Sequence, residues 1–232
     1  MRFRLSALFV TCALAAQPAH AATRNFGVNG FDRIRVEGPY RVKLATGVAP
    51  FASASGSPTA LDRITIEVQG RTLIIHVSKS SWGGYLGQDP GPVEIQAGTH
   101  ELGQASLTGS GTLQIDKIKG LSFNLLVQGS GLASIDQADV DQLRVDIAGT
   151  GGAIISGTAA KLDATLKGTS SLDASGLNIK DAAISADGAA TVKANVTNSV
   201  TINGAGPATF VLTGNPACTS KVAGSASVSG CR

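Results

Sequence analysis

A glycine-centred pattern recurs at nearly constant spacing through the second half of the chain. Gly-Ser-Gly segments begin at Gly109 and Gly129, and related segments begin at Gly149, Gly168 and Gly188. The spacing is the same at every step except from Gly149 to Gly168, which is one position shorter. A fixed period of about 20 residues is typical of solenoids, in which each repeat forms one coil and stacks on its neighbours. This period restricts the fold more than any other feature of the sequence.

The residues around each repeat glycine alternate between apolar and polar. The positions four and two residues before the glycine, and four and six residues after it, are apolar in all five repeats. They are Ala105, Leu125, Val145, Ala164, Ile184, Leu107, Val127, Ile147, Leu166, Ala186, Leu113, Ala133, Ala153, Leu172, Val192, Ile115, Ile135, Ile155, Ala174 and Ala194. Alternation with a period of two indicates β-strands with one side toward a core. The glycine between the two strands marks a tight turn, because glycine tolerates positive φ.

The pattern predicts an all-β fold, namely a parallel β-helix or solenoid-like stack of short strands with coils of about 20 residues over 101–225. Helices are excluded here because the apolar spacing is two and glycine is frequent. A third apolar group in each repeat is expected to form another side of the coil. Its members are Ile118 and Leu121, Val140 and Leu143, Leu162, and Leu177 and Ile179.

Residues 25–100 lack the regular period and are expected to form irregular first coils of the same domain. Alternation between Phe31 and Leu44 predicts strands, and the segments 64–68 and 73–77 predict a hairpin around Gly70. The Ser-, Ala- and Pro-rich segment 47–60 is expected to be a turn region, and 80–92 a loop.

The N-terminal segment 1–21 has the features of a signal peptide. Arg2 and Arg4 precede an apolar run over residues 5–16, and Ala19-His20-Ala21 supplies a cleavage pattern. The run is shorter than the about 20 residues of a membrane span. We therefore expect residues 1–21 to be removed and 22–232 to form a single exported domain. That domain would be periplasmic, at the cell surface or extracellular, with no transmembrane segment after cleavage.

Charge and cysteine content narrow the classes of partner and cofactor. The formal net charge is +3, of which Arg2 and Arg4 supply two charges, and no basic stripe is present, so a nucleic-acid partner is not expected. Cys218 and Cys231 are the two cysteines after residue 21, and an even number in an exported chain predicts a disulfide. Neither His76 nor His100 stands at ligand spacing from a cysteine, so no metal or cofactor is expected.

The repeats themselves offer little catalytic chemistry. Thr112-Leu113 does not supply the Lys-Ser/Thr pair that a phosphate-binding loop needs after its glycines. Asp116 and Asp136 both lie seven residues after a repeat glycine, so they are expected to stack on one face. Two readings remain open: a calcium-binding or acid–base pair, or solvated surface charges. The equivalent position in the next repeat is Ser156, which favours surface charges.

The segment around residues 80–100 holds the other candidate residues. Trp82 and Tyr85 are candidate ligand contacts in a glycine-rich loop, although Trp82 could instead cover one end of the core. The protein is not expected to be an enzyme; the main alternative to this expectation is a cleft between this loop and the first coils, where Asp89 and Glu94 could converge with His100.

Several segments together resemble a known bacterial family. They are Phe31-Asp32-Arg33-Ile34-Arg35-Val36, Tyr40-Arg41-Val42-Lys43-Leu44, Arg71-Thr72-Leu73-Ile74-Ile75 and the Gly-Ser-Gly repeats. The chain is similar to the putative auto-transporter adhesin, head GIN domain family. The resemblance implies a β-helix-like fold outside the cytoplasm and offers no catalytic residues to carry over. We therefore expect a non-enzymatic envelope or cell-surface protein, an adhesin-like binding or scaffold domain for an envelope protein or polysaccharide. The alternative is a carbohydrate-active β-helix enzyme that acts on polysaccharide.

Overall fold

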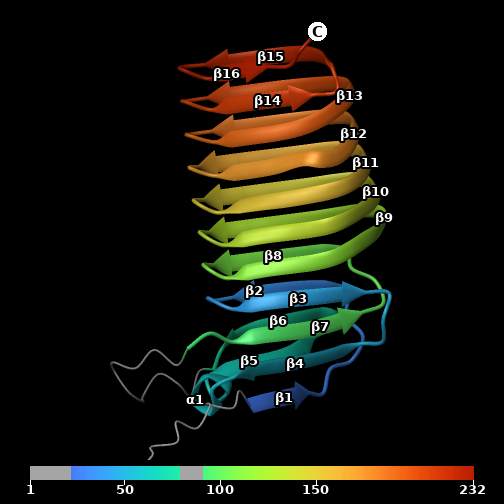
Figure 1. The fold of residues 1–232 in the computed structure, drawn as a ribbon, viewed down its shortest axis with the longest axis vertical. Helices are drawn as coiled ribbons and strands as arrows, with labels where there is room; N and C mark the ends of the chain where they lie inside the picture. Colours follow the sequence, from blue (N-terminus) through green and yellow to red (C-terminus); the bar gives the residue numbers. More distant parts are fainter. Residues whose placement is uncertain (1–21, 79–90) are drawn as a thin grey trace, which may run out of the picture.

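The computed structural model describes residues 22–78 and 91–232. Their strands form one hydrogen-bonded sheet of 16 strands that winds into a rod (Figure 1). The predicted signal peptide and the candidate contacts Trp82 and Tyr85 lie outside the described residues, as does Asp89. In the described part of the chain, no helix is long and apolar enough to cross a membrane.

The central coils form a parallel β-solenoid of about six turns, which confirms the predicted fold. Five long strands carry it: β9 (Thr112–Gly129), β10 (Leu132–Gly149), β11 (Gly152–Gly168), β12 (Ser171–Asp187) and β13 (Thr191–Ala205). Each pairs in parallel with the next, and Leu132 lies between Thr112 and Gly152. The strands are longer than the short strands predicted, because backbone pairing continues through the bend in each coil.

Each coil has two flat sides with the core between them. The first half of β9 pairs with β3 (Arg41–Thr46), and its second half pairs with β8 (Gln104–Gly109). We call the outer surface over β3 and the first halves of β9–β13 the first face, and the surface over β8 and the second halves the second face. The first face continues onto β7 (Glu94–Thr99) at one end and β14 (Thr209–Thr213) at the other. All twenty predicted core side chains are at most 4% exposed.

The prediction for Leu121 is wrong. Its side chain is 79% exposed, and Phe123 fills the core instead, as the register partner of Leu143. Gly120 has a φ of +149°, so the chain turns just before Leu121 and the simple alternation is interrupted. The other predicted members of this third group are buried: Ile118, Val140, Leu143, Leu162, Leu177 and Ile179.

The repeat glycines form the sharp turn of each coil. Gly109, Gly129, Gly149, Gly168 and Gly188 all have positive φ, which confirms that they are structural turns. They also stack closely, since a Cβ on Gly149 would lie 2.5 Å from the carbonyl oxygen of Gly129. Both the backbone conformation and the available space therefore require glycine.

The N-terminal end departs from the parallel pattern. β2 (Arg33–Glu37) pairs in parallel with β8 and with β6 (Thr72–Val77), and β3 with β9. By contrast, β5 (Ile64–Gln69) and β6 form the predicted antiparallel hairpin, and β4 (Phe51–Gly56) runs antiparallel to β7 and to β1 (Ala22–Phe26).

The segment 47–60 is therefore not a turn region as predicted. It contains strand β4 and the short helix α1 (Pro58–Leu61). Ala52 and Ala54 are buried, and pairing with β7 stabilises a strand in which alanine and serine have little intrinsic preference for that conformation.

Cys218 and Cys231 form the predicted disulfide at the C-terminal end of the rod. Their Cα atoms are 5.7 Å apart, and Cys218 lies in β15 (Ala217–Ala223). The backbone N–H of Arg232 also donates to the carbonyl of Pro216, at 3.2 Å. The bond thus ties the chain end to the last coil, which includes β16 (Ser227–Ser229).

We expect the double variant Cys218→Ser/Cys231→Ser to loosen this last coil selectively. In the chain-entropy model, a disulfide that closes a loop of this length stabilises the folded state by about 3 kcal/mol. Terminal coils also open before internal ones. Hydrogen exchange of β15 and β16 should accelerate strongly, whereas exchange of β10 and β11 should not change. Equal exchange in β15 and β16 of the two proteins would contradict this prediction.

Candidate functional site

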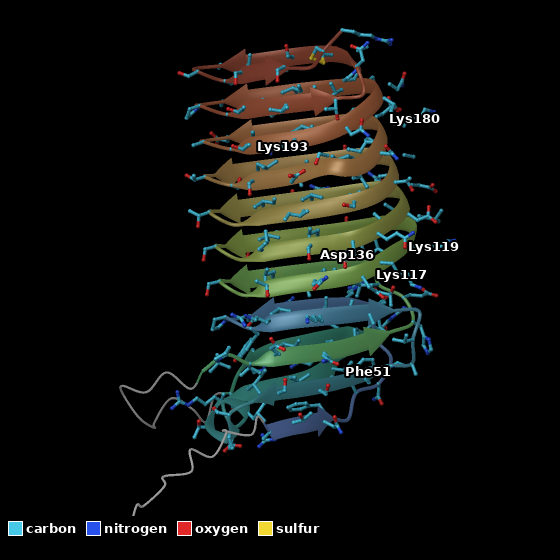
Figure 2. All side chains as sticks on the ribbon, viewed as in Figure 1. Phe51, Lys117, Lys119, Asp136, Lys180 and Lys193 are labelled. Atoms are coloured by element: carbon cyan, nitrogen blue, oxygen red, sulfur yellow. A yellow bond between two sulfur atoms is a disulfide. The ribbon has the colours of Figure 1, made fainter. Side chains whose placement is uncertain are left out.

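A groove of about 430 Å³ lies on the first face near the N-terminal end of the rod. Strands β4, β7, β3, β9 and β10 follow one another there. Its outward-pointing side chains are Phe51, Gln96, Lys43, Gln114, Asp116 and Asp136, and we call it the Phe51 groove. Figure 2 labels Phe51 and Asp136, which come from strands far apart in the sequence.

Strand register brings the polar side chains of the groove together. Lys43 is the partner of Gln96 on one side and of Gln114 on the other. Because their strands alternate between buried and exposed residues, all three side chains point outward from the same column. The groove therefore presents two amides and an ammonium group in a row.

Phe51 supplies the aromatic surface of the groove. It lies opposite Gly98 in the antiparallel pair of β4 and β7. A Cβ on Gly98 would lie 2.6 Å from Cδ1 of Phe51, so the ring occupies the space above this glycine. The Phe51 residue is nevertheless 42% exposed. One side of the ring packs on backbone, and the remaining surface is accessible to a ligand.

Asp116 and Asp136 stack on adjacent strands as predicted, but protein donors already bind both. Oδ1 of Asp116 accepts hydrogen bonds from the backbone N–H groups of Thr46, at 3.0 Å, and Lys117, at 2.6 Å. Oδ2 of Asp136 accepts one from Nε2 of Gln114, at 3.0 Å. Within residues 22–78 and 91–232, no group of three or more His, Cys, Asp or Glu side chains could hold a metal ion. The calcium reading therefore gains no support from the geometry.

Glu94 and His100, which the enzyme alternative would bring together in a cleft, do not converge. Glu94 begins β7 and His100 follows its last residue, so a strand of about 20 Å separates them. Glu94 lies 3.9 Å from Arg41. His76 is elsewhere, on β6, with Nε2 3.6 Å from Oε1 of Glu67.

A second cavity, of about 530 Å³, lies at the bend of the coil beside His100. Glu101, Lys117 and Lys119 line it together with the histidine, and Nζ of Lys119 lies 3.6 Å from Asp139. Its charged groups are of both signs and exposed, and no Phe, Tyr or Trp is among the described residues that line it. The Phe51 groove therefore offers the more specific set of contacts.

Farther along the first face, Asp173 accepts two hydrogen bonds from Ser175 of its own strand. The hydroxyl and the backbone N–H of Ser175 donate to its carboxylate, and Lys193 lies nearby, so the pKa of Asp173 is lowered. Asp181, on β12 near the bend, has a lowered pKa because Ser199 and Asn198 donate hydrogen bonds to it across the coils. The hydrogen bonds of Asp181 link neighbouring coils, and both aspartates lie outside the groove.

Phe51 is not among the candidate residues that the sequence predicts, because the segment 47–60 that contains it is predicted to be a turn region. The sequence nevertheless contains a signal for a strand at this place. The segment Phe51-Ala52-Ser53-Ala54-Ser55 alternates between alanine and other residues, which places Phe51 on the polar side of a strand. A large aromatic residue on that side is a candidate for a binding contact.

The chain matches the family model described as putative auto-transporter adhesin, head GIN domain, over residues 30–216. Among curated proteins, none matches.

Solved structures with the same fold include proteins from Bacteroides and Parabacteroides species. A putative adhesin from Bacteroides fragilis aligns with a TM-score of 0.72 and 19% identity, covering 89% of this chain and 98% of its own. A putative lipid binding protein from Parabacteroides distasonis aligns with a TM-score of 0.69 and 20% identity, covering 90% of this chain and 95% of its own. A putative adhesin from Parabacteroides merdae aligns with a TM-score of 0.64 and 16% identity, covering 90% of this chain and 95% of its own. At these identities the likeness shows the fold alone.

Proposed function

This chain belongs to the putative auto-transporter adhesin, head GIN domain family, and from that premise we propose that it binds an envelope polysaccharide through the Phe51 groove. The observation that carries the proposal is the exposed Phe51 ring beside a row of outward-pointing amides. Family membership supports an adhesin-like role at the cell surface, and the groove supplies a place for the contact.

The chemistry of the groove suits a sugar. A pyranose ring has an apolar C–H face that can pack on an aromatic ring, and hydroxyl groups around its edge. Gln96 and Gln114 carry both donors and acceptors, Lys43 carries donors, and the two aspartates carry acceptors. A bound acyl chain would instead need an apolar cavity. The space between the two faces is filled by buried side chains, so a lipid ligand is less well supported.

We also propose that residues 1–21 are removed as a signal peptide and that 22–232 act as a single domain outside the cytoplasm. The charged start, the apolar run and the cleavage pattern support the signal peptide. An adhesin-like family also fits an exported protein, and periplasm, cell surface and medium remain alternative destinations.

Binding without cleavage is supported by the placement of the acidic groups. A glycosidase needs two carboxyl groups that flank one bond, one as acid and one as base or nucleophile. Asp116 and Asp136 accept hydrogen bonds from the protein itself, and Glu94 and His100 lie at opposite ends of β7. The function proposed is therefore attachment, not hydrolysis.

The variant Phe51→Ala tests the proposal. We expect its affinity for purified envelope polysaccharide to fall at least tenfold, because removing one stacking ring loses about 1.4 kcal/mol or more. Val211→Ala, also exposed on the first face but distant from the groove, should bind as the wild type does. Thermal unfolding of both variants shows whether the fold is intact. Equal binding by folded Phe51→Ala and wild type would overturn the assignment of the groove.

A further inference from the structure

Resting on the proposed function, we propose that the ligand is an extended, uncharged, N-acetylated glycan chain. Beyond the Phe51 groove, the bound glycan continues along the first face to a second contact formed by Leu132 and Ile154. The two contacts would hold one polymer lying along the rod axis, across the strands.

A continuous column of outward side chains joins the two places. Successive register partners are Gln96, Lys43, Gln114, Ser134 and Ile154, one from each of five neighbouring strands from β7 to β11. The column begins in the Phe51 groove and passes directly onto the apolar contact. A ligand that extends from the groove along the rod axis therefore reaches Ile154 while it stays on the first face.

Leu132 and Ile154 form an apolar patch that the core does not explain. They are 41% and 47% exposed, and both point away from the interior. Gly152, the register partner of Leu132, lies two residues before Ile154 and is buried beneath neighbouring side chains. A Cβ on Gly152 would lie 2.5 Å from Oγ of Ser171 and 3.5 Å from Cδ1 of Leu132, so these two side chains cover the backbone beside the exposed apolar groups.

The second face of the same strands has a different character. Its outward positions on β10 and β11 include the charged residues Arg144, Asp146, Asp163 and Lys167 and the small residues Ala148 and Thr165. The apolar patch is therefore confined to the face that also carries the Phe51 groove, which supports one ligand for both.

The distance between the contacts sets the length of the ligand. From β4 to β11 there are five steps between neighbouring strands, or about 24 Å at the usual strand spacing. A single sugar cannot bridge this distance, whereas an extended oligosaccharide of several rings can. Short sugars would reach only one contact.

The side chains along the column favour an N-acetylated, uncharged chain. The amide of an N-acetyl group can both donate to and accept from Gln96 or Gln114, and its methyl group can pack on Leu132 and Ile154. The charges in and beside the column are of both signs: Lys43, a member of the column, lies in the same groove as Asp116 and Asp136, and Arg41 lies 3.9 Å from Glu94. Asp173 and Lys193 follow Ile154 in the same column and end the apolar patch.

The test measures binding of β-1,4-linked N-acetylglucosamine oligomers by calorimetry. We expect the hexasaccharide to bind at least tenfold more tightly than the trisaccharide. The double variant Leu132→Ser/Ile154→Ser should remove this advantage and leave the affinity for the trisaccharide unchanged. Phe51→Ala should weaken the binding of both the trisaccharide and the hexasaccharide. Val211→Ser, at a position beyond the proposed path of the ligand, should weaken the binding of neither. The unsubstituted β-1,4-glucose hexasaccharide should bind at least tenfold more weakly than its N-acetylated counterpart.

The outcomes separate this inference from the proposed function. Equal affinity for the short and long oligomers, or equal affinity with and without N-acetyl groups, would overturn the extended N-acetylated ligand. If neither oligomer bound, but envelope polysaccharide bound in a Phe51-dependent way, the inference would fall and the proposed function would stand. Failure to bind any envelope polysaccharide would refute the proposed function itself. Circular dichroism of each variant confirms that a loss of binding is not a loss of fold.

Discussion

Replacing Phe123 by alanine is expected to lower the free energy of unfolding by about 3–5 kcal/mol. Phe123 is fully buried on β9, next to Leu143 of the following coil. Removing the ring leaves a cavity between coils whose backbones are held in place by parallel pairing on both sides. The surrounding side chains therefore cannot close the space, and the transfer free energy of the ring is lost along with its packing.

Leu121→Ala is the matched control for this experiment. The two residues are separated by one position, yet Leu121 is almost wholly exposed and its truncation should change stability by less than about 0.5 kcal/mol. Urea unfolding followed by circular dichroism measures both variants. If Leu121→Ala lowered the free energy of unfolding more than Phe123→Ala does, the bend of this coil would be placed incorrectly.

Gly149→Ala is expected to destabilise the solenoid by about 3 kcal/mol or more, the upper end of the cost of a strained backbone conformation. The φ of +116° already disfavours any residue with a Cβ, by about 1–3 kcal/mol. The new methyl group would also lie 2.5 Å from the carbonyl oxygen of Gly129, which accepts hydrogen bonds from Thr150 and Gly151. To make room, the two coils must separate at the turn, and these hydrogen bonds must lengthen.

Gly120→Ala separates the two causes of that loss. Gly120 also has positive φ, but a Cβ there would meet nothing within 4 Å. Its substitution should therefore show the backbone effect alone and be clearly milder than Gly149→Ala in the same unfolding experiment. If the two variants lost the same stability, close stacking of the turn glycines would have no energetic role.

The proposed binding surface depends on this stacking. The Phe51 groove and the patch of Leu132 and Ile154 take side chains from six strands, and their spacing is set by backbone pairing between coils. A rigid scaffold holds such groups in place without an entropic penalty at the moment of binding. Variants that separate the coils should for this reason weaken binding even when they lie far from the groove.

Only part of the candidate site could be predicted from the sequence. The stacking of Asp116 on Asp136 follows from their equal distance after a repeat glycine, since the period converts sequence position into place on the rod. Phe51 could not be placed in this way. Its position depends on the antiparallel pairing of β4 with β7, two segments that are far apart in the sequence and share no repeat.

The sequence by itself determined the solenoid, its inward-facing side chains and the glycine turns, and its two late cysteines indicated the disulfide. These properties are local and periodic, so each repeat carries the same information. All twenty apolar positions beside the repeat glycines therefore predict the same inward-facing pattern. The tertiary structure alone decided the bend at Gly120, the burial of Phe123 in place of Leu121, and the antiparallel end that positions Phe51. Those features arise from non-local strand pairing, in which packing against a distant partner outweighs the weak preferences of a short segment.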